Sequence, residues 1–235
     1  MSWTSTYTYS WNQPPRPARV RTSRTELIQI GIAYVVLTVD MLLILSANSY
    51  LGRSANGSFS SITLGTIALA AGAALTGFVA HELAHKVVAQ RHGFWAEFRL
   101  SPFGLILSLV TAAVGFLFAA PGATLVAGMS EQDADNWGRT SLAGPMSNLA
   151  FATVFYAGAV GASIALPGWV GPLLFLAFIN AWFGTFNLVP IGPLDGRKVL
   201  RWSTAIWVLA LVGTAAATVV AYLAYFGGAG PSLGL

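Results

Sequence analysis

Long apolar stretches dominate this chain and restrict it to folds that suit a lipid bilayer. Five of them are long and apolar enough to cross a bilayer as helices: residues 26–47, 61–89, 139–166, 169–189 and 199–226. Charged residues make up 9% of the sequence and the mean hydropathy is +0.67. Soluble domains carry about 25% charged residues. The sequence therefore predicts an all-α polytopic membrane protein with about five transmembrane helices.

We expect one transmembrane domain over residues 26–228, with its core at residues 61–200. The first 25 residues are polar, proline-containing and arginine-rich, which predicts a disordered basic tail in the cytoplasm. Residues 229–235 are expected to be a flexible C-terminus. The net charge of +4 comes from basic clusters beside the apolar stretches. These clusters fit determinants of topology in a cell membrane, so we expect the bilayer, and no nucleic acid, as a partner.

One apolar stretch contains the motif His81-Glu82-Leu83-Ala84-His85. Residues four apart share one face of a helix, so both imidazoles can point to one metal ion. Glu82 is the expected general base of a zinc hydrolase. Ionisable residues are costly in hydrocarbon, so three of them at membrane depth call for a functional explanation. The chain has no cysteine, which leaves His, Asp, Glu or water as metal ligands.

A catalytic zinc needs a third protein ligand, and Asp195 is suited to that position. It follows prolines and glycines that break helical hydrogen bonding, and such backbone at membrane depth faces protein or a water-filled cavity. Asp40 is another acid within an apolar stretch. At about 1.5 Å per residue it lies roughly 20 Å from the cytoplasmic end of its helix, and His81 and His85 roughly 10 Å from theirs. For Asp40 we therefore expect a polar contact or a water-facing position near the far side.

The apolar residues 104–120 decide on which side Asp195 lies. If they crossed the membrane, Asp195 and the basic cluster Arg197, Lys198 and Arg201 would lie outside. If they form a re-entrant or sixth apolar helix, Asp195 falls on the cytoplasmic side, level with the histidines. Charge placement and metal geometry agree on the second arrangement. Residues 94–100 alternate enough to predict a short β element near the active site.

Together these motifs resemble the site-2 protease family, the intramembrane zinc metalloproteases. The first family motif is matched by residues 81–85, and the second by Asn187-Leu188-Val189-Pro190 followed by Leu194-Asp195-Gly196. Between them, Leu142-Ala143-Gly144-Pro145 is similar to a further family segment. The resemblance covers roughly residues 61–200. The chain departs from the family in its apolar insert at 104–120, in a single span after the Asp motif, and in having no stretch long enough for the PDZ domain that some relatives carry.

This resemblance implies one zinc ion per chain, held by His81, His85 and Asp195, with Glu82 as general base. It also implies that Asn187 lies near the substrate carbonyl and stabilises the oxyanion. From the residues alone, Asn187 can equally be a helix cap or a turn former before the proline. Asn148 is expected to form an interhelical hydrogen bond.

The expected function is hydrolysis of a peptide bond within or near a transmembrane segment of a membrane-protein substrate. The active site would open towards the cytoplasm. Such a substrate would bind as an extended strand beside residues 94–100 and 121–128. One alternative is a zinc-binding but inactive scaffold, against which the presence of Glu82 argues. Another is a metal transporter, which would need more polar residues in the outer halves of the spans. The sequence makes no prediction of the oligomeric state.

Overall fold

The structure, a computed structural model, describes residues 20–47, 62–115, 121–129 and 133–227. The predicted C-terminus, the loop at residues 48–60 and most of the N-terminal tail lie outside the described residues. The elements are α1 (Arg24–Ala47), α2 (Leu64–Ala74), the π turn η1 (Leu75–Val79), α3 (Ala80–Arg91), β1 (Trp95–Leu100), α4 (Pro102–Ala113), β2 (Gly122–Ala127), α5 (Ala134–Ala165), the 3-10 turn η3 (Pro167–Trp169), α6 (Val170–Asn187), α7 (Asp195–Trp202) and α8 (Thr204–Gly227).

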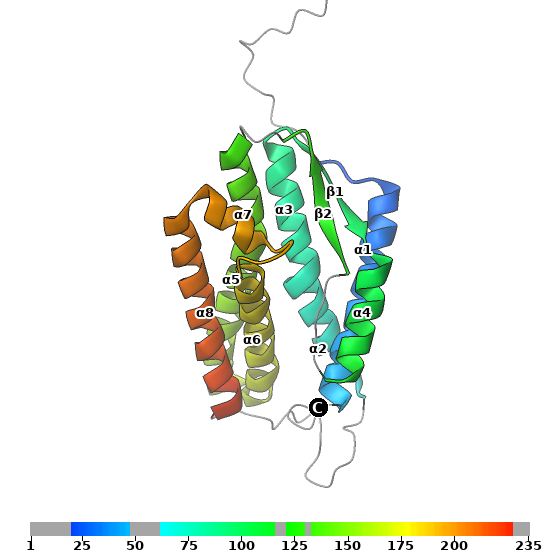
Figure 1. The fold of residues 1–235 in the computed structure, drawn as a ribbon. Coiled ribbons are helices and arrows are strands. Elements are labelled where there is room, and N and C mark those ends of the chain that lie inside the picture. The colour runs from blue at the N-terminus through cyan, green and yellow to red at the C-terminus, as the bar shows by residue number, and fades with distance from the viewer. Residues whose placement is uncertain (1–19, 48–61, 116–120, 130–132, 228–235) are drawn as a thin grey trace, which may run out of the picture.

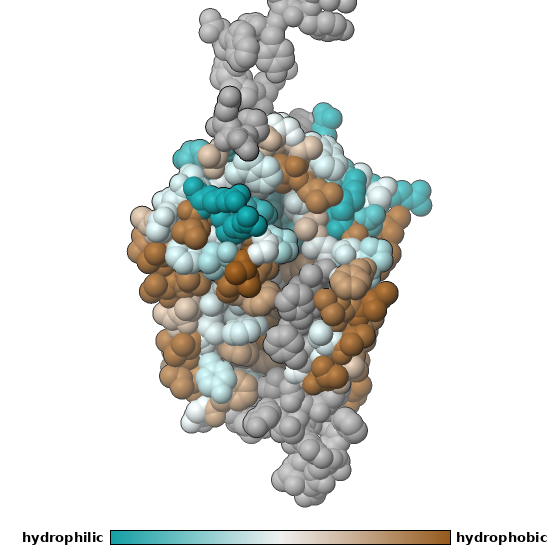
Figure 2. All heavy atoms as spheres, viewed as in Figure 1, coloured by the Kyte–Doolittle hydropathy of each residue, from teal (hydrophilic) through white to brown (hydrophobic). Residues whose placement is uncertain are grey.

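Within the described residues, five helical segments are long and apolar enough to cross a membrane, as predicted. They are Arg24–Leu45, Leu64–Arg91, Ala134–Ala165, Pro167–Asn187 and Thr204–Gly227. Large apolar side chains on their outer faces are widely exposed, among them Leu64, Ile164 and Leu209. Hydrophilic side chains gather at one end of the molecule, while hydrophobic ones cover its flanks (Figure 2). This distribution suits a bundle whose sides face lipid.

The predicted sixth apolar helix is α4, which has 12 residues. At about 1.5 Å per residue it spans roughly 18 Å, less than the ~30 Å of the hydrocarbon core. It begins where Ser101 caps it, with Oγ accepting a hydrogen bond from the Gly104 N–H at 3.1 Å. As a straight helix, α4 is too short to cross a bilayer, in agreement with the predicted extra apolar helix that does not span.

The predicted β element is a two-stranded antiparallel sheet, a wide hairpin whose strands are connected through α4 and in which Phe98 of β1 lies opposite Thr124 of β2. It packs beside α3 and α1, at the end of the bundle that also carries α7 (Figure 1). Phe98 is buried against Phe78 of the π turn, with the rings edge to face at 5.7 Å. This contact holds the hairpin against the helix that carries the metal motif.

Two predicted boundaries are wrong. The last apolar span begins at Thr204, because residues 195–202 form the separate helix α7. Ser203 has extended backbone angles (φ −156, ψ 113), which end α7 and leave its basic residues at the polar end of the bundle. The predicted tail also extends too far along the chain. Arg21 exchanges hydrogen bonds with Gln90 through its backbone N–H (2.7 Å) and carbonyl (3.0 Å).

Candidate metal centre

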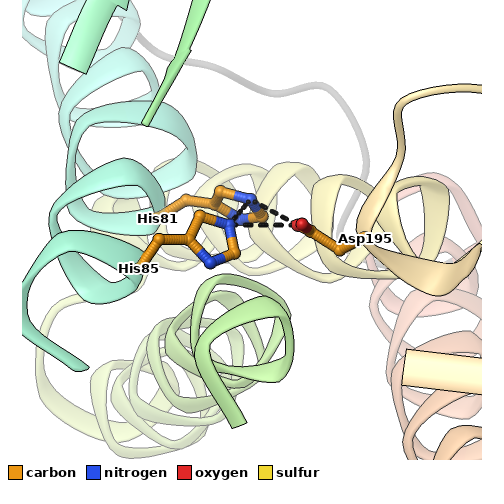
Figure 3. A group of neighbouring side chains, drawn as sticks. All are labelled: His81, His85 and Asp195. Carbon is orange, nitrogen blue, oxygen red and sulfur yellow. Dashed lines mark hydrogen bonds and ion pairs between the residues drawn. The ribbon is translucent and has the colours of Figure 1, made fainter. Parts of the chain in front are cut away.

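Three buried side chains converge between α3 and α7. From α3, the Nε2 atoms of His81 and His85 lie 3.0 Å apart. Asp195, the first residue of α7, brings its Oδ2 atom to 3.3 Å from His81 Nε2 and 3.0 Å from His85 Nε2. In Figure 3 both imidazoles project from one face of α3 towards the carboxylate. The structure thus brings together the three residues that the sequence predicted as ligands.

Hydrogen bonds on the other ring nitrogens fix the orientation of both histidines. His81 Nδ1 lies 2.6 Å from the Asn148 side-chain oxygen, and His85 Nδ1 lies 2.6 Å from the Thr140 carbonyl oxygen. Both oxygens are acceptors, so each Nδ1 carries a proton and Nε2 is the atom of each ring that is available to a metal ion.

The donor set fits zinc. Nitrogen and oxygen ligands that lie about 2.0–2.1 Å from a tetrahedral zinc are about 3.3 Å from one another, close to the separations found here. Burial alone would raise the pKa of Asp195, but the charge of His85 and hydrogen bonds from both imidazoles hold this pKa well below its usual range. The carboxylate is therefore in the ionised form that binds metals. Its second oxygen, Oδ1, faces Lys198 Nζ at 3.5 Å.

Gly144 of α5 leaves the space that an ion would need. A Cβ atom on this residue would lie 2.6 Å from His81 Nε2 and 2.6 Å from His85 Cε1. Any larger side chain would therefore stand among the ligand atoms. This gives a physical reason for glycine in the segment Leu142-Ala143-Gly144-Pro145.

The position of Asp195 depends on how α7 is held. The sequence predicted an unwound segment, and the structure places this segment at residues 188–194, with Asp195 opening the helix that follows. A Cβ atom on Gly196 would overlap the backbone of Leu188, so glycine allows this close approach. At the other end of α7, Trp202 Nε1 donates to Asp135 Oδ1 at 2.7 Å. The helix that presents the carboxylate is thus fixed at both ends.

A cavity of about 150 Å³ adjoins the three ligands and contains both predicted catalytic residues. Glu82 lies in its wall, and its Oε2 accepts hydrogen bonds from the backbone N–H (2.7 Å) and hydroxyl (2.8 Å) of Thr124. Asn187 also lines the cavity, although its side-chain N–H donates to the Phe183 carbonyl of its own helix at 3.0 Å. Contact between Asn187 and a substrate oxyanion stays a prediction.

Asp40 does not belong to the metal centre. Its carboxylate is not among the converging ligand atoms, and the side chain is fully buried in α1. A water-facing position, one of the two we predicted, is therefore wrong, and α4 packs against this helix. Neither carboxylate oxygen has a hydrogen bond of good geometry among the described residues, but the Ser108 side chain of α4 interacts with the carboxylate, which is the kind of polar contact that we predicted.

The chain is similar to known proteins over more than half of its length. A family model, Peptidase family M50, matches residues 159–227, which include Asp195. A protein of Methanocaldococcus jannaschii named "Putative zinc metalloprotease MJ0611" is 41% identical over 143 residues, which are 59% of this chain and 71% of that protein. The chain belongs to peptidase family M50. This is the site-2 protease family that its motifs resemble.

A second relative matches over a smaller share of its own length. A Mycobacterium tuberculosis protein named "Putative zinc metalloprotease Rip3" is 34% identical over 129 residues, in strains H37Rv and Erdman alike. These residues are 54% of this chain and 28% of that protein. No solved structure matches the chain. Membership of M50, together with five membrane-length helices, makes the chain a multi-pass membrane protein of a metalloprotease family.

Asn148 has a larger part in the site than the sequence indicated. The predicted interhelical hydrogen bond is confirmed, since its Nδ2 donates to the Gly77 carbonyl of the π turn at 2.9 Å. Its oxygen is also the acceptor that orients His81. A polar residue inside an apolar stretch was the signal available in the sequence. The contact of Thr124 with Glu82, by contrast, could not be predicted from any local sequence pattern.

We expect Asn148→Ala to weaken zinc binding about 10–100-fold, because His81 loses the acceptor that fixes its tautomer and ring orientation. Competition with a fluorescent zinc chelator measures this change. Thr153→Ala, on the same helix but at an exposed position, is the control and should bind zinc like the wild type. Equal affinity of the Asn148→Ala protein and the control would show that Asn148 does not support the metal site.

Proposed function

We propose that this chain is an intramembrane zinc metalloprotease that hydrolyses a peptide bond within or near a transmembrane segment of a membrane protein. One observation carries the proposal: two imidazole Nε2 atoms and the Asp195 carboxylate oxygen lie 3.0–3.3 Å from one another beside Glu82. Both histidines and Glu82 belong to a helical segment of membrane-spanning length. His81, His85 and Asp195 would hold one zinc ion. When bound, zinc supplies a Lewis acid and lowers the pKa of a coordinated water.

Glu82 acts as the general base. One side of its carboxylate is held by Thr124, and no described residue donates a hydrogen bond to Oε1. This oxygen can take the proton of the attacking water and pass it to the leaving amine. Asn187 would donate to the carbonyl oxygen of the scissile bond as negative charge develops on it, using the side-chain N–H that does not bond to Phe183.

The substrate would bind as an extended strand along β2. The other edge of β1 is closed by α1, since the N–H groups of Phe98 and Leu100 donate to the side chains of Glu26 and Gln29 at 3.0 Å each. Within the described residues, the outer edge of β2 pairs with no other strand. Thr124 lies on that edge and lines the cavity. A substrate helix must therefore unwind before it pairs there.

We place the active-site opening and the N-terminus on the cytoplasmic side. Support comes from the basic residues of α7, of which Arg197 and Arg201 are exposed at the end of the bundle that carries the site. Lys and Arg beside membrane spans favour the cytoplasm.

Hydrolysis of an unfolded protein tests this function, because an unfolded chain supplies extended segments without unwinding of a membrane helix. The purified protein in detergent is expected to cleave fluorescein-labelled casein, to stop when ortho-phenanthroline removes the metal, and to recover when zinc is added back. The inactive scaffold predicts a zinc-loaded protein that cleaves neither casein nor a set of transmembrane peptides. That result would reject the protease.

A further inference from the structure

The contact between Glu82 and Thr124 joins the expected base to the hairpin. Thr124 directs two donors, its backbone N–H and its hydroxyl, to the same carboxylate oxygen of Glu82. The hydroxyl also lies 2.9 Å from the Glu82 backbone carbonyl, and its single proton serves one of these acceptors at a time. Glu82 is 9% exposed, so these hydrogen bonds are shielded from competing water.

The register of the hairpin explains why Thr124 has a backbone N–H to give. Phe98 lies directly opposite Thr124, and the N–H of Phe98 points away from β2, to Glu26. In an antiparallel pair, two opposite residues either both bond across the ladder or both point outward. The N–H of Thr124 therefore lies on the free edge of β2, where it reaches Glu82 at no cost to the hairpin.

The hairpin is also fixed to α3 one turn beyond Glu82. Glu26, which accepts from Phe98 through Oε1, bonds through its other oxygen to Lys86 Nζ. Both charged side chains are almost completely buried. Lys86 is four residues after Glu82, so both side chains lie on the same face of α3. Glu82 contacts the hairpin directly, and Lys86 contacts it through Glu26. Thr124 is thus held at a set position relative to the helix that carries the ligands.

We propose that Thr124 is a positioning residue for Glu82. It holds Oε2, so that Oε1 is directed to the attacking water. Because the N–H of Thr124 is bonded to Glu82, the substrate strand would pair with the neighbouring residues of this edge, and Thr124 then sets the base in register with one peptide bond of that strand. This inference rests on the proposed protease function. Pre-positioning of the base raises the rate of the chemical step and leaves the metal ligands untouched.

Removal of the hydroxyl alone is the sharpest test. Thr124→Val keeps the backbone N–H and the side-chain shape, and is expected to lower kcat on labelled casein about tenfold, with KM and zinc content unchanged. Thr124→Ser, which restores the hydroxyl, should recover most of the rate. Thr153→Val, whose hydroxyl bonds only to its own helix, is the matched control. Wild-type kcat in Thr124→Val, or equal losses in the Val and Ser variants, would overturn the proposal.

A second measurement does not depend on catalysis. Thermal unfolding of Glu82→Ala, Thr124→Val and the double variant reports whether the two side chains interact. We expect the double variant to lose less Tm than the sum of the single losses, because both substitutions remove the same contact. Additive losses would overturn the proposal. If the wild type cleaves no substrate while the Tm losses are non-additive, then the protease function fails and the contact stands.

Discussion

Glu82→Gln is expected to abolish peptide hydrolysis while zinc stays bound. Glutamine has nearly the shape of glutamate and keeps an oxygen that can accept from Thr124, so the hairpin contact persists. An amide cannot take the proton of the attacking water, and loss of a positioned general base lowers rates about 10²–10⁴-fold. Cleavage of labelled casein and zinc content by mass spectrometry, measured on the same preparation, check both parts of this prediction.

Glu97→Gln is the matched control for this substitution. Glu97 lies on β1 and pairs with Arg99 at 2.6 Å, so the control removes the same charge from the same end of the protein but outside the cavity. It should retain wild-type cleavage. An active Glu82→Gln protein would contradict the mechanism, and loss of zinc from it would mean that Glu82 supports the metal site.

Gly144→Ala is expected to prevent zinc binding, and cleavage with it. The added methyl group would lie 2.6 Å from His81 Nε2, in the space that the metal must share with the ring nitrogens. Alanine is a better helix former than glycine by about 1 kcal/mol, so loss of zinc would not arise from a weaker α5. Equilibrium zinc binding, followed by chelator competition, measures the effect.

Gly161→Ala controls for the same substitution in the same helix, at a position where nothing lies within 4 Å of the added Cβ. It should bind zinc with wild-type affinity. Full zinc binding by Gly144→Ala would show that the ion lies away from the space bounded by Gly144 and the two imidazoles.

Local signals explain what the sequence could predict. Five apolar stretches required five membrane-length helices, and the i, i+4 spacing of His81 and His85 placed both rings on one face. Helix-breaking residues before Asp195 marked the irregular segment that brings it to the histidines. These features depend on length, spacing and backbone chemistry, which neighbouring residues determine.

Non-local contacts were beyond such reasoning. Thr124 reaches Glu82 across 42 residues of sequence, and only the register of the hairpin directs its N–H to that carboxylate. The segment at residues 121–128 was predicted to pair with a substrate, whereas its described strand pairs first with β1. The start of the last span was misplaced for a smaller reason. Val199, Leu200 and Trp202 are apolar and come just before the last span, but they belong to α7, which ends at Ser203.

Zinc content of the detergent-purified protein, wild type beside Asp195→Ala, tests the metal centre most directly. Alanine removes the carboxylate that reaches both Nε2 atoms and leaves His81 and His85 in place. We predict about one zinc per chain in the wild type, as expected for a site with three protein ligands, and loss or strong weakening of binding in the variant. Full zinc retention by Asp195→Ala would contradict the ligand set.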